Sequence, residues 1–114
     1  MNKGSPKPRW YRKVGESYIG KYILVGITYV DHKGNETQRQ QMHGVIESAD
    51  KNGIKIALKG VYEGQSWTMP PDQSAIKAAQ PGTYTLKMSG EKIENPDLLS
   101  TWVITEPEPE KHET

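Results

Sequence analysis

The stretch that most constrains the fold is QMHGVIESADKNGIKIAL, residues 41–58, because two extended runs flank an Asn-Gly pair. Asn and Gly both tolerate the positive φ that tight hairpin turns require. After the turn, Ile54, Ile56 and Leu58 alternate with polar or small residues. Such alternation is typical of a strand with one buried face. The stretch therefore predicts two antiparallel strands joined by a tight turn.

Similar signals recur along the chain. Further extended runs are KYILVGITYVD, TQRQQMHGVIES, VYEGQSWTM, TYTLKMS and STWVIT, separated by Gly, Pro and Asn turn signals such as DHKGN. Gly26 and Gly44, inside two of these runs, predict a bulge or a bend. With about six strands in a short chain, the pattern predicts a small, strongly bent antiparallel barrel.

Two helical segments interrupt the strand pattern. Trp10, Val14 and Tyr18 recur at helical spacing, and Gly20 is placed to end such a helix. Between the late strands, Asp72 can cap a helical turn after Pro70-Pro71. The sequence thus predicts a short N-terminal helix and one later helical turn.

The ends of the chain carry opposite charge. Residues 1–21 have a net charge of +5 and residues 91–114 a net charge of −5, although the whole chain is at +1. We expect a disordered basic tail at 1–8, one β-barrel domain at 9–105 and a disordered acidic tail at 106–114. No run approaches the roughly 20 apolar residues of a membrane helix, and there is no cysteine, so the expected compartment is the cytoplasm.

The chain resembles the Sm-like and SH3-like small β-barrels. Gly44 and Asp50 in HGVIESAD have the spacing of the first Sm motif, and IKIAL is similar to the strand that follows it. Ser48 stands where that family has a second glycine, and Met88 stands where its second motif ends in glycine. The resemblance implies the barrel fold and does not imply the family's RNA pocket. The whole chain also resembles small bacterial proteins, which adds no site.

The candidate binding residues are basic or aromatic. In KPRWYRK, bases interleave with aromatic residues, as in sites that neutralise a nucleic-acid backbone and stack on its bases. The alternative is that Trp10 anchors the helix to the barrel. Trp67, beside Pro70-Pro71, is either an exposed partner-binding residue or part of the core. The full candidate set is Arg9, Trp10, Arg12, Lys13, Lys55, Lys59 and Trp67.

Catalytic and metal sites are not expected. His43 could act as a general base only with a positioned partner, and His32 and His112 lie in a predicted turn and a predicted tail. We therefore expect His43 to be structural or solvent-facing, and we expect His43→Ala to change stability by less than about 1 kcal/mol, as for a position that faces outward. Asp31, His32, Asn35 and Glu36 could ligate a metal weakly, but they are more typical of a polar turn. No metal or other cofactor is predicted.

These patterns predict a non-enzymatic binding or assembly module. The expected partner is another protein or a second copy of the chain, without membrane contact. The alternative is a nucleic-acid-binding Sm-like barrel that uses the basic residues above. An enzyme built on His43 is the remote third possibility.

Overall fold

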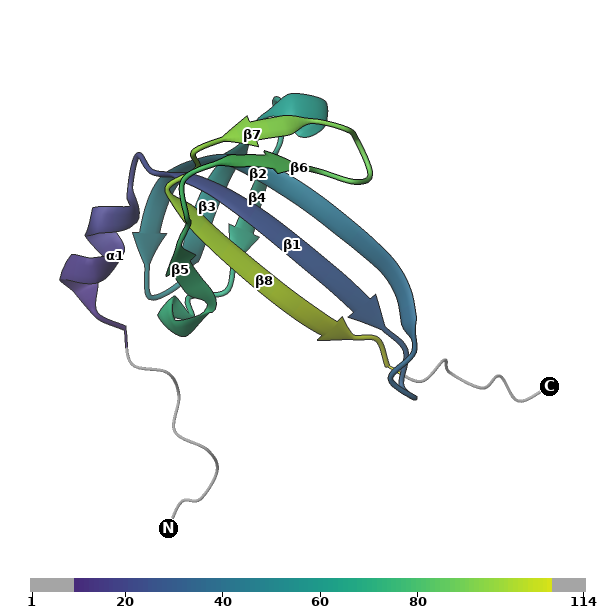
Figure 1. The fold of residues 1–114 in the computed structure, drawn as a ribbon. Helices are drawn as coiled ribbons and strands as arrows, with labels where there is room; N and C mark the ends of the chain where they lie inside the picture. Colours follow the sequence, from purple (N-terminus) through teal and green to yellow (C-terminus); the bar gives the residue numbers. More distant parts are fainter. Residues whose placement is uncertain (1–9, 108–114) are drawn as a thin grey trace, which may run out of the picture.

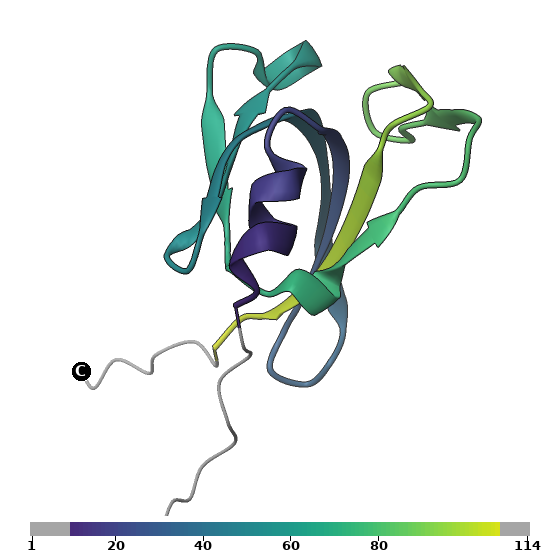
Figure 2. The same cartoon turned by 90° about the vertical axis from the view of Figure 1, so that its left-hand side faces the viewer.

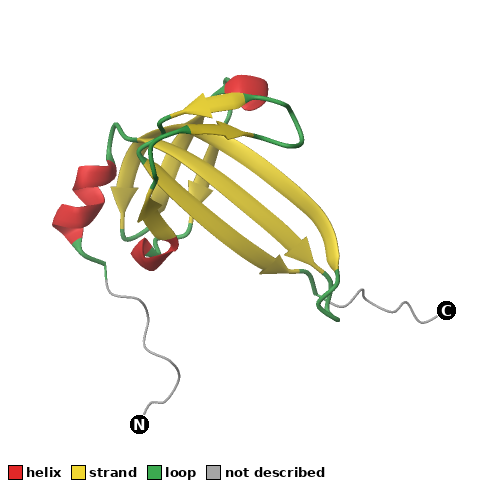
Figure 3. Cartoon of the chain, in the orientation of Figure 1, coloured by secondary structure: helices red, strands yellow, loops and turns green. Residues whose placement is uncertain are grey.

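The structure, a computed structural model, describes residues 10–107. The predicted tail at 1–8, most of the tail at 106–114 and Arg9 lie outside these residues. The chain is mainly β, as predicted (Figures 1 and 3). Its helix and strands are α1 (Arg12–Tyr18), β1 (Tyr22–Val30), β2 (Glu36–Asp50), β3 (Gly53–Leu58), β4 (Ser66–Met69), β5 (Ile76–Ala78), β6 (Thr83–Thr85), β7 (Lys92–Glu94) and β8 (Leu98–Thr105).

Six strands form one mixed sheet in the order β4-β3-β2-β1-β8-β5, and β6 pairs with β7 in a separate two-stranded sheet. The prediction of a purely antiparallel sheet is wrong at one pair, because β8 runs parallel to β1. Parallel neighbours need a long connection, and here everything from β2 to β7 supplies it. Asp97 fixes the start of β8 beside the start of β1: its N–H donates to the Tyr22 carbonyl, and its carboxylate accepts from the Tyr22 N–H.

The sheet is strongly curved (Figure 1), and α1 lies across the space between its two halves (Figure 2). β4 and β5 are its edges, and within residues 10–107 they do not pair with each other. The predicted closure into a barrel is therefore not confirmed. The curvature still brings the two halves together across the interior, since the Ser100 hydroxyl lies 3.3 Å from the Met69 sulfur.

The core lies on one face of this sheet. Its largest fully buried side chains come from β1 to β4: Ile23, Val25, Ile27, Ile46, Ile54, Ile56 and Met69. The predicted alternation in β3 is confirmed, because Ile54, Ile56 and Leu58 are buried, Ala57 is half-buried, and Lys55 and Lys59 are exposed. Trp10 and Tyr18 pack against the core, but Val14 is exposed. Trp10 precedes α1, so the predicted helix face formed by these three residues is wrong.

Most of the predicted turns are present. The turn after β1 is held by Asp31, whose Oδ1 accepts from the N–H groups of Lys33 and Asn35. Asp72 caps the later helical turn by accepting from the Ser74 N–H. Gly20 follows the C-cap of α1 with φ +88°. Local turn chemistry is therefore where the sequence predicts structure best.

The predicted bulge at Gly26 is absent, because β1 and β2 pair without interruption from Tyr22 to Tyr29. The register shifts instead at Tyr29/Val30 and at Ile46/Ser48. The strand predicted at 83–89 is shorter than expected: β6 ends at Thr85, Leu86 is buried and Met88 is exposed.

Candidate functional site

The predicted basic residues do not form one patch of unpaired charge. Arg9 lies outside the described residues. Arg12 and Lys13 are exposed on α1, and the Arg12 Nε lies 3.1 Å from Glu16 Oε2. On β3, the Lys55 Nζ lies 3.8 Å from Glu47 Oε1. Arg12 and Lys55, two of the predicted cations, therefore each have an acidic side chain close by.

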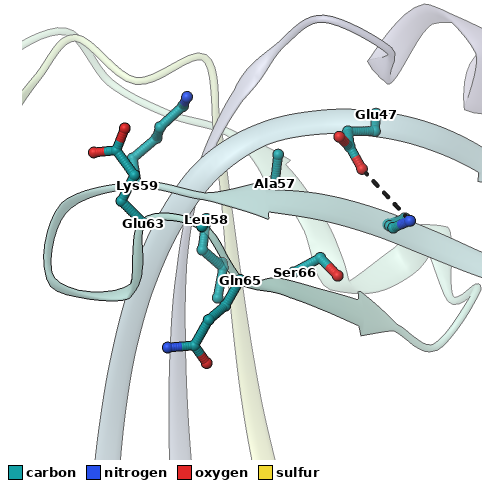
Figure 4. A pocket seen from close by; sticks show the side chains of 9 residues that line it. Glu47, Ala57, Leu58, Lys59, Glu63, Gln65 and Ser66 are labelled. Carbon is teal, nitrogen blue, oxygen red and sulfur yellow. Dashed lines mark ion pairs between the residues drawn. The ribbon is translucent and has the colours of Figure 1, made fainter.

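Lys55 and Lys59 line one open groove of about 450 Å³ beside β3 (Figure 4). The same groove carries Glu47 and Glu63, so its two cations are matched by two anions. Apart from Leu58, the remaining lining is small or polar, and it comes from β3, β4 and the loop between them. A groove of zero net charge is not what binding to a phosphate backbone requires.

Trp10 and Trp67 are both half-buried and pack against the core. A β-carbon on Gly15 would meet the Trp10 ring, so the ring lies directly on the helix backbone. This is the anchoring arrangement for Trp10 that the sequence left open. Trp67, on β4 opposite Ile56, is likewise in contact with the core.

His43 is buried, with 5% of its surface exposed, so the expectation that it faces outward is wrong. The reason lies in tertiary structure. Side chains alternate along β2, so His43 does point away from the core face that Met42 occupies. That second face is covered at this point, because the loop between β6 and β7 places Glu91 against the histidine.

The His43 ring lies between two partners. Its Nδ1 is 2.6 Å from the Tyr22 hydroxyl, and its Nε2 is 3.3 Å from Glu91 Oε1. The second contact is electrostatic and lacks hydrogen-bond geometry. Glu91 also accepts a hydrogen bond from the Ser89 hydroxyl. Gly60, with φ +68°, packs its backbone on the His43–Glu91 pair, where a side chain would overlap Glu91.

The surroundings of Tyr22 favour the protonated form of its hydroxyl. Burial raises the pKa of Tyr22, and the nearby carboxylates of Glu91 and Glu63 raise it further. A hydroxyl whose pKa is raised is not prepared to act as a nucleophile or base. The Tyr22 hydroxyl therefore keeps its proton and shares a hydrogen bond with His43 Nδ1, while His43 Nε2 faces Glu91. This arrangement holds the β6–β7 loop on the sheet.

The most unusual surface is the outer edge of β8. β5 pairs with β8 only at Leu98–Ser100, so Thr101–Thr105 have a strand neighbour on the β1 side alone within residues 10–107. We call these five residues, Thr-Trp-Val-Ile-Thr, the β8 edge. Val103 is 66% exposed and Ile104 is 38% exposed. Sheet edges usually carry charges, proline or bulges that discourage further pairing, and the β8 edge has none of them.

Sequence reasoning missed this edge as well as Tyr22 and Glu91. STWVIT was identified as a strand, but its exposure depends on where β5 stops. Glu91 comes close to His43 only through the β6–β7 loop. A usable signal was the absence of charge and proline through residues 98–105.

Residues 10–107 contain no group of three or more His, Asp or Glu side chains that could hold a metal ion. In the same residues, no helix is long and apolar enough to cross a membrane. The chain matches no protein-family model, no curated protein and no solved structure in the comparisons made. The similarity to Sm-like barrels stays a prediction.

Proposed function

We propose that this chain is a non-enzymatic binding and assembly module that contacts proteins through the β8 edge. The observation that carries the proposal is an uncharged strand edge of five residues, with Val103 exposed at its centre, that pairs with no strand on its outer side in the described chain. Such an edge can accept a further strand, whose backbone hydrogen bonds supply affinity and whose alternate side chains supply specificity. We also propose the cytoplasm as its compartment, since a chain without cysteine has no need of an oxidising one.

The arrangement at His43 supports the non-enzymatic part of the proposal. The buried imidazole has a hydrogen bond with the Tyr22 hydroxyl on one side and a close contact with the Glu91 carboxylate on the other, which is an arrangement suited to a structural role. Its Nε2 is fully buried, so a substrate could not reach it without displacing the β6–β7 loop.

The proposal can be tested by a substitution in β8, because the backbone N–H groups on its outer side can be identified. The Glu106 N–H donates to the Val30 carbonyl on the β1 side, and β8 pairs with β1 without a register shift from Leu98 to Thr105. Backbone groups of successive residues alternate between the two sides of a strand. The N–H groups of Thr101, Val103 and Thr105 therefore point outward, away from β1.

Val103→Pro should abolish strand binding while leaving the bonds between β8 and β1 intact, because the N–H that it removes points outward. We expect a labelled heptapeptide of alternating Thr and Val with Lys at both ends to bind the wild-type chain in fluorescence anisotropy. With Val103→Pro, its affinity should fall by about tenfold or more. Val103→Thr, which keeps both the β-branch and the N–H, should bind within about twofold of wild type.

Circular dichroism and thermal unfolding would show that both variants are folded. If folded Val103→Pro binds the peptide as well as wild type does, the β8 edge is not the binding surface. If wild type fails to bind at any peptide concentration up to about 1 mM, the proposal fails outright.

The nucleic-acid alternative makes a different prediction. A protein that neutralises about four phosphates should lose on the order of 10²-fold in affinity between about 50 and about 200 mM salt. Because Arg12 and Lys55 already face acids, we expect no micromolar binding of a mixed-sequence single-stranded RNA even at about 50 mM salt. Binding that disappears as salt is raised, and that Arg12→Ala with Lys13→Ala weakens, would favour the nucleic-acid function instead.

A further inference from the structure

We infer that the strand bound at the β8 edge is β8 of a second copy of the chain, antiparallel to the first, with the two-fold axis at Val103. The inference rests on the proposed function, because it uses the same edge. It adds the identity of the partner and the register of the pairing.

The sequence of the β8 edge is complementary to itself. An antiparallel pairing centred on Val103 places Val103 opposite its own copy, Thr101 opposite Thr105, and Trp102 opposite Ile104. A two-fold interface requires the same patch on both subunits, and this five-residue segment meets that requirement at every position. No charged residue meets a like charge, since the segment contains none.

The backbone directions agree with this register. Thr101, Val103 and Thr105 present their N–H and C=O groups outward, as the bond from the Glu106 N–H to Val30 on the β1 side indicates. In the proposed pairing, these three residues form the hydrogen-bonded pairs, with about six bonds in all. Trp102 and Ile104 form the non-hydrogen-bonded pairs, in which side chains come closer, and an aromatic residue opposite a β-branched one stabilises a sheet.

The ends of the segment also fit. β5 occupies the edge up to Ser100, and Pro107 follows the strand, so about five residues are available from each copy. The pairing would place Glu106 of one copy opposite Ser100 of the other, where Ile76 of β5 already pairs, so the ladder ends at Thr101 and Thr105. An interface of this length is smaller than the roughly 1,200 Å² of standard complexes, so we expect a reversible dimer that dissociates on dilution.

Disulfide trapping can test the register, because the chain has no cysteine of its own. In Val103→Cys, the two thiols would meet at the axis with Cα atoms about 5.5 Å apart, within disulfide range. In Thr101→Cys, the two thiols would be four residues out of register, about 14 Å apart, and could not join. Met88→Cys is the matched control for exposure, since Met88 and Val103 are both 66% exposed.

Each full-length variant would be oxidised mildly at about 50 µM, a concentration suited to a weak dimer, and scored by non-reducing electrophoresis. Val103→Cys should become covalently dimeric at least about tenfold faster than Thr101→Cys or Met88→Cys. A mixture of Thr101→Cys and Thr105→Cys chains should yield the mixed dimer. Sedimentation equilibrium of the uncrosslinked wild type should show a dimer that Val103→Pro removes and Val103→Thr keeps.

Two results would overturn the inference. Val103→Cys dimerising no faster than Met88→Cys would exclude the second copy as the partner. Equal trapping of Thr101→Cys and Val103→Cys would indicate parallel or unregistered association rather than a two-fold pair. The peptide experiment distinguishes failure of this inference from failure of the proposed function. If the peptide binds but no dimer forms, the proposed function stands with another partner. If the peptide does not bind and no dimer forms, both the inference and the proposed function are wrong.

Discussion

Gly44→Ala is expected to destabilise the chain by about 3 kcal/mol or more. Gly44 pairs with Ile23 on one side and Leu58 on the other. A β-carbon there would overlap the Ala57 carbonyl oxygen and lie 2.9 Å from the Leu58 Cα. These are backbone atoms of β3, so the clash can be relieved only by separating the two strands. Urea denaturation would measure the loss as a lower midpoint.

Gly26→Ala is the matched control. Gly26 also lies inside a strand and is paired on both sides, but no atom comes within 4 Å of the position where its β-carbon would stand. Alanine is preferred to glycine in a regular strand, so we expect stability to stay within about 0.5 kcal/mol of wild type or to rise. Equal losses in the two variants would show that the close approach at Gly44 does not limit the packing of β3.

These two glycines show where prediction from the sequence stops. Both stand in extended runs and were given the same interpretation, a bulge or a bend. The sheet continues without a register shift through both. The two positions differ because the backbone of β3 lies against the place where a β-carbon of Gly44 would stand, while nothing lies that close at Gly26. This difference depends on a neighbouring strand rather than on local sequence.

Turns and alternating strands could be predicted because their causes are local. The turn between β2 and β3, the Asp31 turn and the alternation of β3 each depend on residues a few positions apart, although the turn residues are Lys51 and Asn52 and Gly53 already pairs with Asp50. β5 and β7 could not be predicted, since each has three residues, too few to show a period. The parallel pairing of β8 with β1 was also hidden, because it joins segments separated by most of the chain.

The same distinction between local sequence and tertiary contacts applies to the candidate site. Outward-facing Lys55 and Lys59 were predicted correctly from alternation, but the acids that match their charge, Glu47 and Glu63, come from β2 and from the loop after β3. The exposure of Val103 is set by where β5 ends. Residue type and spacing therefore predict which way a side chain points, while tertiary contacts decide what faces it.

His43→Ala is expected to destabilise the chain by about 2–3 kcal/mol near neutral pH. The substitution empties the space of a buried ring and removes the hydrogen-bond partner of the Tyr22 hydroxyl and the partner of Glu91. His32→Ala is the control, because His32 is exposed in the turn after β1 and should change stability by less than about 0.5 kcal/mol. Similar small effects for both variants would show that His43 contributes nothing through these contacts.

Glu91→Gln should then show that part of this stabilisation depends on charge. Burial raises the pKa of Glu91, but the hydrogen bond from Ser89 and the contact with His43 outweigh it, so the pKa lies below its ordinary value of 4.5. A carboxyl group with a lowered folded-state pKa stabilises the fold above its unfolded-state pKa, and this contribution is lost as the pH falls through the folded-state value. Glu91→Gln should therefore be less stable than wild type near neutral pH, by less than His43→Ala is.

The stability difference between Glu91→Gln and wild type should shrink as the pH falls below the ordinary carboxyl pKa, because the wild-type carboxylate then takes up its proton. Urea midpoints across this acid range would follow the change. A difference independent of pH would mean that the Glu91 carboxylate acts on the β6–β7 loop through shape alone. Convergence at acid pH would show that the charge on Glu91, facing His43 and Ser89, is what holds the loop against the sheet.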